Sequence, residues 1–213
     1  MHRMTAGILV TIVLFAAIAA YAGDGTSSDA IDRLEAVADR FPPQVTSENR
    51  EEIVRLWKSV ELGLLRYRHD QPKPDFNAEL MLGEIYRLGH NLDVEDASDK
   101  AIAHFKAALA IDPSSSKAHM LLGRHLTYIG ELKEGQHELL LAIALDPRGA
   151  GDVRLFDMAQ NCYLQKQFAL AASFADRFLA IHPLDPAMTA IAAASKKVLA
   201  GGTPPKVMTI EVP

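Results

Sequence analysis

The sequence contains a single cysteine and a single tryptophan among 213 residues. One cysteine cannot form an internal disulfide, so the fold depends on packing and not on a disulfide framework. The chain also lacks a G-x-S-x-G nucleophile motif, a phosphate-binding loop and a C-x-x-C-H haem attachment motif. These absences argue against a hydrolase, a nucleotide-dependent enzyme and a c-type cytochrome. We therefore expect no enzymatic activity and no catalytic residues.

Metal-binding patterns are missing as well. None of the eight histidines has another at the i, i+4 spacing that places two imidazoles on one helix face. The segment 91–99 holds four acidic residues, but it lacks the glycine and the distal glutamate of a calcium-binding loop. We interpret this segment as a solvated loop that caps the following helix through Asp96 or Ser98. No metal and no cofactor are expected.

The overall charge and apolar content narrow the class of protein further. The net charge is −5 at pH 7, which argues against a nucleic-acid partner. Apolar residues make up 49% of the chain, enough for a packed core. The chain is therefore expected to contain a globular domain that binds something other than DNA or RNA.

The N-terminus resembles a targeting segment. Residues 5–23 contain no charged side chain and include an apolar core from Ile8 to Ala20. The tripeptide Ala20-Tyr21-Ala22 has the small-x-small pattern that precedes a cleavage site. We predict a secretory signal peptide over residues 1–22, and hence a periplasmic or secreted protein. The alternative is an uncleaved membrane anchor, because the uncharged run approaches the ~20 residues that span a bilayer.

Three prolines divide the rest of the chain into similar segments. Pro113 and Pro147 are 34 residues apart, and Pro183 follows after 36 more. Each proline ends an apolar helical run, because proline cannot continue the hydrogen-bond ladder. Upstream residues recur in one register: Leu82, Gly83, Tyr86, Ala101, Phe105 and Ala108; Leu122, Gly123, Leu126, Gly135, Leu139 and Ala142; Met158, Ala159, Cys162, Ala171, Ala175 and Phe178. The sequence therefore predicts three helical hairpins, with small residues where the two helices of a hairpin approach each other.

This register resembles the tetratricopeptide repeat (TPR) family, whose pattern is L-G-x2-Y, A-x3-F and a closing proline. The resemblance covers residues 76–183 and implies an all-α solenoid of about three repeats with flanking helices. The tryptophan of the family pattern is absent, and Glu79, His119 and Leu155 stand in its place. The fold class that we expect is thus an all-α TPR solenoid behind a signal peptide.

The flanking segments have their own patterns. Residues 28–70 carry two amphipathic stripes, which we interpret as a helix pair that forms either an N-terminal cap or a degenerate repeat. Residues 185–200 begin with Asp185 as N-cap and Pro186 in the first turn, and they predict a C-terminal capping helix. Residues 201–213 follow two glycines and contain a β-prone run, so we expect an extended tail.

The family resemblance also implies a binding surface. In TPR proteins the first helix of each hairpin lines a concave groove, and carrying that register over gives these residues: Asn77, Glu84, Arg87, Lys117, Met120, Arg124, Thr127, Tyr128, Phe156, Gln160 and Tyr163. Cations beside a methionine and aromatic side chains suit a partner peptide or helix with an acidic group. We expect a protein-binding scaffold or adaptor of the cell envelope. The alternative is a structural subunit of a stable envelope assembly or secretion complex.

Overall fold

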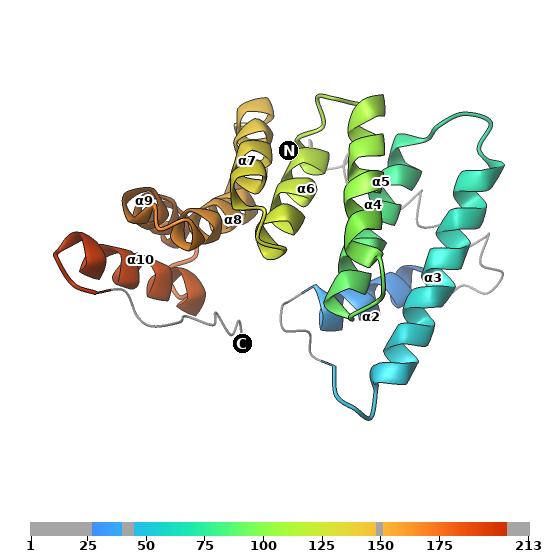
Figure 1. The fold of residues 1–213 in the computed structure, drawn as a ribbon, viewed down its shortest axis with the longest axis horizontal. Coiled ribbons are helices and arrows are strands. Elements are labelled where there is room, and N and C mark those ends of the chain that lie inside the picture. Colours follow the sequence, from blue (N-terminus) through green and yellow to red (C-terminus); the bar gives the residue numbers. More distant parts are fainter. Residues whose placement is uncertain (1–26, 40–44, 148–150, 204–213) are drawn as a thin grey trace, which may run out of the picture. The chain divides into compact units, whose positions relative to one another are not determined.

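The computed structural model describes residues 27–39, 45–147 and 151–203 of the chain. Over these residues the protein is entirely helical, with nine helices and no strand (Figure 1). The expectation of an all-α fold is therefore confirmed for this part of the chain. The predicted signal peptide, residues 1–22, and most of the predicted tail lie outside the described residues. The chain forms two compact units that divide between Pro113 and Ser114.

The first unit contains four helices: α2 (Ser27–Ala38), α3 (Arg50–Asp70), α4 (Phe76–Asn91) and α5 (Ala97–Ile111). Helices α4 and α5 pack against each other as a hairpin, α3 packs on α4, and α2 contacts both α3 and α4. The apolar stripe of α3 explains its position, because Trp57, Val60 and Leu64 are buried. The indole Nε1 of Trp57 donates a hydrogen bond to the carbonyl oxygen of Ile85 on α4 at 2.7 Å.

Two helix starts in this unit differ from simple capping rules. The turn before α3 is closed by a reciprocal pair, in which the Thr46 amide donates to Asn49 Oδ1 at 2.8 Å and the Asn49 amide donates to Thr46 Oγ1 at 3.4 Å. Asp96 precedes α5, but it has a positive φ of 57° and makes no side-chain cap. A capping side chain needs an extended backbone at that position, so the prediction that Asp96 caps this helix is wrong. Ser98 lies inside α5 and is not at its N-cap position.

The second unit contains five helices: α6 (Ser116–Tyr128), α7 (Leu132–Leu145), α8 (Gly151–Leu164), α9 (Phe168–Leu179) and α10 (Pro186–Leu199). Helices α6 and α7 form one hairpin, α8 and α9 form the next, and α10 packs on α9 and α8. The side chain of Asp185 caps α10 by accepting a hydrogen bond from the Met188 amide at 2.8 Å, with Pro186 in the first turn. This start agrees with the sequence pattern.

Glycine permits the close approach of helices in both α4–α5 and α6–α7. A Cβ atom built on Gly83 would lie 2.5 Å from the ring of Phe105. A Cβ atom on Gly123 would lie 2.9 Å from both the carbonyl oxygen of Gly135 and the amide nitrogen of Leu139. Phe105 and Leu139 are 34 residues apart, so the two hairpins make the same kind of contact in the same register. The expectation that small residues stand at the helix crossings agrees with this packing.

An apolar core fills the second unit. It consists of buried residues from α7, α8, α9 and α10: Leu139, Leu155, Met158, Ala159, Cys162, Ala171, Ala175, Phe178, Ala187, Met188, Ile191 and Ala192. Small and large side chains alternate in this set, which lets the helices interdigitate. Among the helices of the described ranges, none is both long enough and apolar enough to span a bilayer.

Candidate binding site

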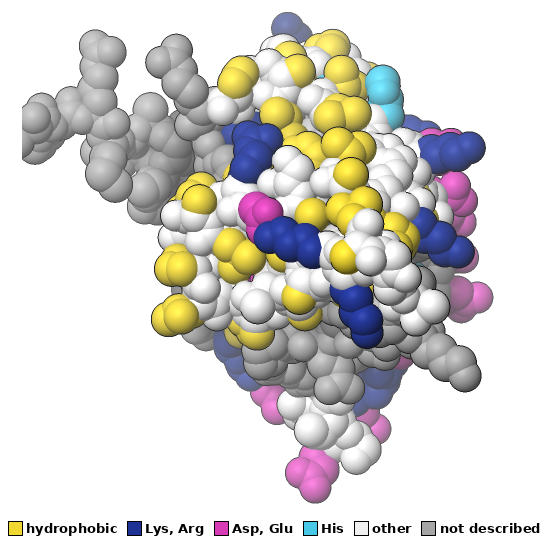
Figure 2. All heavy atoms as spheres, turned by 90° about the vertical axis from the view of Figure 1, so that its left-hand side faces the viewer, with side chains coloured by type: hydrophobic (Ala, Val, Ile, Leu, Met, Phe, Trp, Pro, Cys, Tyr) yellow, Lys and Arg dark blue, Asp and Glu magenta, His cyan; other side chains and the backbone are white. Residues whose placement is uncertain are grey.

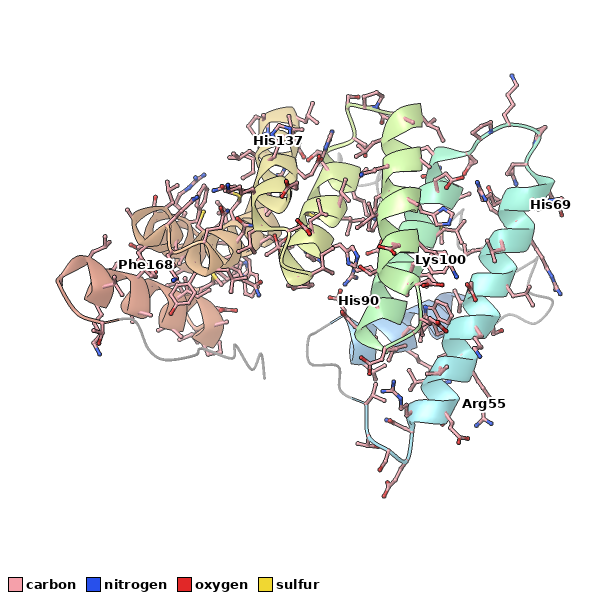
Figure 3. The ribbon with its side chains drawn as sticks, in the orientation of Figure 1. Arg55, His69, His90, Lys100, His137 and Phe168 are labelled. Carbon is pink, nitrogen blue, oxygen red and sulfur yellow. The ribbon has the colours of Figure 1, made fainter. Side chains whose placement is uncertain are left out.

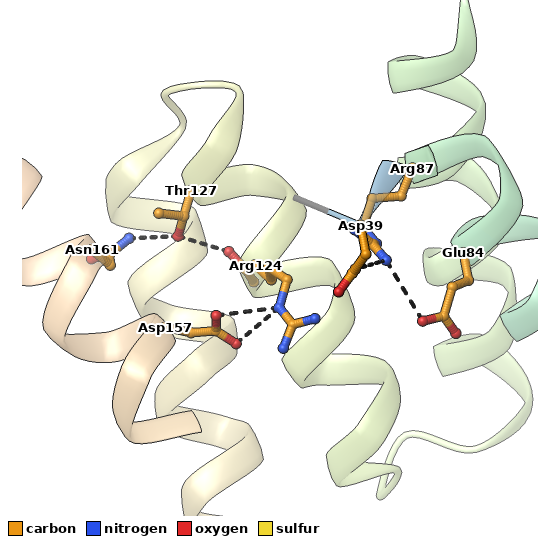
Figure 4. A network of polar contacts seen from close by, with 8 residues as sticks. Asp39, Glu84, Arg87, Arg124, Thr127, Asp157 and Asn161 are labelled. Atoms are coloured by element: carbon orange, nitrogen blue, oxygen red, sulfur yellow. Dashed lines mark hydrogen bonds and ion pairs between the residues drawn. The ribbon is translucent and has the colours of Figure 1, made fainter. Parts of the chain in front are cut away.

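The predicted groove residues fall into the two units. Asn77, Glu84 and Arg87 lie on α4 in the first unit, where Asn77 and Glu84 are half-buried. Arg87 is 1% exposed, and its Nη2 atom donates to Asp39 Oδ1 at 2.6 Å (Figure 4). The same nitrogen lies 3.8 Å from Glu84 Oε1. A guanidinium held between two carboxylates of its own chain offers little charge to a partner.

The other eight residues lie on two helices of the second unit that contact each other. Helix α6 carries Lys117, Met120, Arg124, Thr127 and Tyr128, and helix α8 carries Phe156, Gln160 and Tyr163. These residues therefore share one region of the molecule. Their exposure differs, because Lys117 is exposed, Thr127 is buried and the others are half-buried.

Two of the eight residues hold α6 to α8. Arg124 Nε donates to both carboxylate oxygens of Asp157, at 3.2 and 3.1 Å, and the Asp157 side chain is 3% exposed (Figure 4). Asn161 Nδ2 donates to Thr127 Oγ1 at 2.8 Å and to the carbonyl oxygen of Leu132 at 2.9 Å. Arg124 and Thr127 thus have structural contacts that sequence reasoning did not predict.

Aromatic and sulfur-containing side chains make up most of the remaining surface. Met120, Phe156 and Tyr163 are half-buried and pack against the apolar core of the unit. The ring of Phe156 meets that of Phe178 edge-on at 5.6 Å, and Tyr163 meets Phe168 at 5.8 Å. Such rings are held in place from below while part of each remains exposed. A partner would lose little side-chain entropy on contacting them.

Sequence reasoning missed the acidic and amide partners Asp39, Asp157 and Asn161. The signal for the last two lies in the repeat period, since Asp157 follows Arg124 by 33 residues and Asn161 follows Thr127 by 34. A polar residue one repeat away from another of complementary type is placed to meet it across adjacent hairpins. Asp39 has no such signal, because it follows α2, outside the regular repeats.

A carboxylate and an imidazole pair inside each of the first two hairpins, at the position where the TPR pattern has tryptophan. In the first unit Glu79 on α4 pairs with His104 on α5 at 2.7 Å, and Arg68 Nε donates to the other oxygen of Glu79 at 2.5 Å. In the second unit His119 on α6 pairs with Glu138 on α7 at 2.5 Å. The polarity is reversed, because the first hairpin has the acid on its first helix and the second has it on its second helix.

The pair in the first unit belongs to a larger cluster of rings. Tyr86 stacks on His104 with ring centroids 5.3 Å apart and meets Trp57 edge-on at 5.9 Å. Burial raises the pKa of the Tyr86 phenol far above its usual range, and a hydrogen bond to Glu61 adds to this effect. The phenol is therefore neutral at physiological pH and has a structural role.

Amide side chains surround the cysteine of the second unit. Gln136 on α7 donates to Gln167 Oε1 at 2.8 Å, and Gln165 donates to Gln136 Oε1 at 3.0 Å. Gln136 Nε2 also lies 3.5 Å from the Cys162 sulfur. Burial raises the pKa of the Cys162 thiol to about 11, with the Gln136 contact acting weakly in the opposite direction. A buried neutral thiol is a poor nucleophile, and its place is in the core.

The described residues contain no group of three or more histidine, cysteine, aspartate or glutamate side chains arranged to hold a metal ion. What the site offers is a contact surface on α6 and α8 with an exposed lysine. A scan against models of known protein families found no match, and no curated protein matched the chain in a sequence search.

Proposed function

We propose that the protein is a non-enzymatic scaffold or adaptor of the TPR type, which binds a peptide or helix of a partner protein against α6 and α8. The observation that carries this proposal is the repeated hairpin contact, Gly83 to Phe105 and Gly123 to Leu139, in a single 34-residue register. Hairpins that repeat in one register are the units of helical solenoids, and solenoids serve mainly to bind other proteins. The hydrophobic segment in residues 1–22 supports an exported protein of the cell envelope.

The contacts of the second unit refine the partner. Arg124 is engaged with Asp157, so the cation that remains exposed among the predicted groove residues of this unit is Lys117. Met120, Phe156 and Tyr163 supply adaptable apolar and aromatic contacts near it. The partner that fits is a segment with an acidic side chain beside apolar anchors.

An affinity experiment tests this proposal. The protein is compared with a Lys117→Glu, Gln160→Ala variant and with a Lys133→Glu control, which makes the same charge change on α7. Lys117 and Lys133 are both exposed, and Gln160 is half-buried. Partners are captured from envelope extract, purified, and titrated against each variant by calorimetry. We expect binding about 10-fold weaker for the double variant and nearly unchanged for the control. A partner that binds all three equally would contradict the proposed surface.

The second candidate is a structural subunit of an envelope assembly or secretion complex. Large apolar side chains are exposed on the last two helices and the turn between them, including Ile181 at 57%, Leu184 at 92% and Leu199 at 58%. Figure 2 shows apolar side chains interspersed with lysines and arginines over this face. Light scattering separates the two candidates, because a subunit is expected to self-associate without its partner, whereas an adaptor is expected to be monomeric.

A further inference from the structure

A pocket in the first unit lies outside the predicted groove. It has a volume of about 840 Å³ and is lined by Leu65, Arg68, His69, Gln71, Pro72, Lys73, Pro74, Glu79, Ala107, Ala110 and Ile111. The carboxyl end of α3, the linker to α4, the first turn of α4 and the last turns of α5 all contribute to it. Figure 3 shows His69 at this end of α3, beside the linker. The volume falls within the range of sites that hold small ligands or side chains of a partner.

The charges of the pocket are cationic, although the chain as a whole is acidic. Arg68, His69 and Lys73 line it against the single acid Glu79. Both oxygens of Glu79 are already engaged, one with Arg68 at 2.5 Å and the other with His104 at 2.7 Å. No described residue forms an ion pair or hydrogen bond with the Lys73 side chain, which is exposed. The pocket therefore has spare positive charge and no spare carboxylate.

Arg68 is positioned to bind a carboxylate. Its Nε atom donates to Glu79, whose side chain is 4% exposed, and this contact fixes the guanidinium plane. The terminal nitrogens make no hydrogen bond to any described residue, and the side chain is 48% exposed. A guanidinium whose orientation is already set forms further hydrogen bonds at a lower entropic cost.

The rest of the lining is apolar. Leu65 on α3 and Ala107, Ala110 and Ile111 on α5 form the walls, and Ile111 remains 40% exposed. Pro72 and Pro74 stiffen the linker that borders the pocket. This mixture suits an aliphatic group next to one negative charge. It does not suit a nucleic acid, since three cations in an acidic chain neutralise few phosphates.

We propose that this pocket is a second protein-docking site, which takes a short segment of a partner protein with one carboxylate beside branched apolar side chains. The carboxylate binds Arg68 and Lys73, and the apolar side chains lie against Leu65 and Ile111. The site belongs to the first unit alone, so it does not depend on the surface proposed on α6 and α8.

Nuclear magnetic resonance titration of the purified protein tests the site. The probes are the blocked peptide N-acetyl-Leu-Leu-Asp amide and its Asn counterpart, which has the same shape without the charge. We expect saturable shifts of the amides of residues 68–74 and 107–111, with affinity about 5-fold weaker for the neutral probe. Lys73→Glu and Ile111→Ser are each expected to weaken binding about 5-fold. Both side chains are exposed, so these variants should retain the fold.

The matched control is Lys106→Glu, which makes the same charge change at an exposed position of α5 outside the pocket. This variant should bind the acidic probe as the unchanged protein does. The proposal is overturned if the two probes shift the same amides equally, if Lys73→Glu and Lys106→Glu have equal effects, or if no saturable shift occurs at residues 68–74. Shifts confined to α6 and α8 would also overturn it, while supporting the separately proposed surface.

Discussion

The hairpins α4–α5 and α6–α7 solve the same packing problem with opposite chemistry. Each joins its two helices by a carboxylate–imidazole pair, but the first has Glu79 facing His104 and the second has His119 facing Glu138. His104 and Glu138 are 34 residues apart, so the positions are equivalent. The comparison shows that the repeat conserves a complementary contact and not a residue type. The contact also has different surroundings, because Arg68 joins the pair of the first hairpin.

Exchanging the two charges in each hairpin gives the sharpest test of this comparison. We expect Glu79→His with His104→Glu to lose about 3 kcal/mol of stability, because Arg68 would then face an imidazole in a nearly buried position. The exchange His119→Glu with Glu138→His regenerates the pair in its other polarity and should cost less than about 1 kcal/mol. Urea denaturation followed by circular dichroism measures both. Equal losses in the two hairpins would show that Arg68 has no role.

The position of Tyr86 gives a second comparison, because the third hairpin has Cys162 in the same register. Burial raises the thiol pKa from 9.0 to about 11, so at pH 8 the native protein holds about 100-fold less thiolate than the unfolded chain. Reaction with a disulfide reagent should be slower by about this factor in buffer than in urea. It should accelerate about 10-fold for each pH unit between 8 and 10, below the native pKa. Equal rates in buffer and urea would show that the thiol is exposed.

The glycines at the two helix crossings differ in what a methyl group would meet. At Gly123 it would press on the backbone of Gly135 and Leu139, which cannot turn aside, whereas at Gly83 it would meet only the ring of Phe105. We expect Gly123→Ala to lose about 2 kcal/mol. The loss at Gly83→Ala should be partly reversed by adding Phe105→Leu, while Leu139→Ala should not rescue Gly123→Ala. Thermal unfolding of the single and double variants decides whether the two crossings differ as described.

Exposed ion pairs should contribute least. Lys196 on α10 lies 2.7 Å from Asp176 on α9, with the two side chains 57% and 49% exposed. We expect Asp176→Asn to change stability by less than about 0.5 kcal/mol, since water screens such a pair. Asp157→Asn is the matched change at a 3% exposed carboxylate that holds Arg124, and it should cost several times more. Similar values for the two variants would contradict the role given to burial.

Much of the helical framework was predictable because its signals are local. Prolines after apolar runs, the Asp185 cap and small residues at the crossings are readable from neighbours in the sequence. The state of Arg87 was not predictable, because its partner Asp39 lies 48 residues away and outside the repeat register. The left-handed backbone at Asp96 was also hidden, since aspartate commonly caps helices with an extended backbone. The pocket beside Lys73 depends on helices distant in sequence, so no local pattern could reveal it.

The single tryptophan and the single cysteine happen to lie in different units. Trp57 is fixed in the first unit by its hydrogen bond to Ile85, and Cys162 is enclosed in the core of the second. The chain therefore carries one intrinsic reporter for each unit, with no engineered label required. Indole fluorescence follows the first unit and thiol accessibility follows the second during the same urea titration. Coincident midpoints would mean that the units unfold cooperatively, and separate midpoints would give the stability of each one.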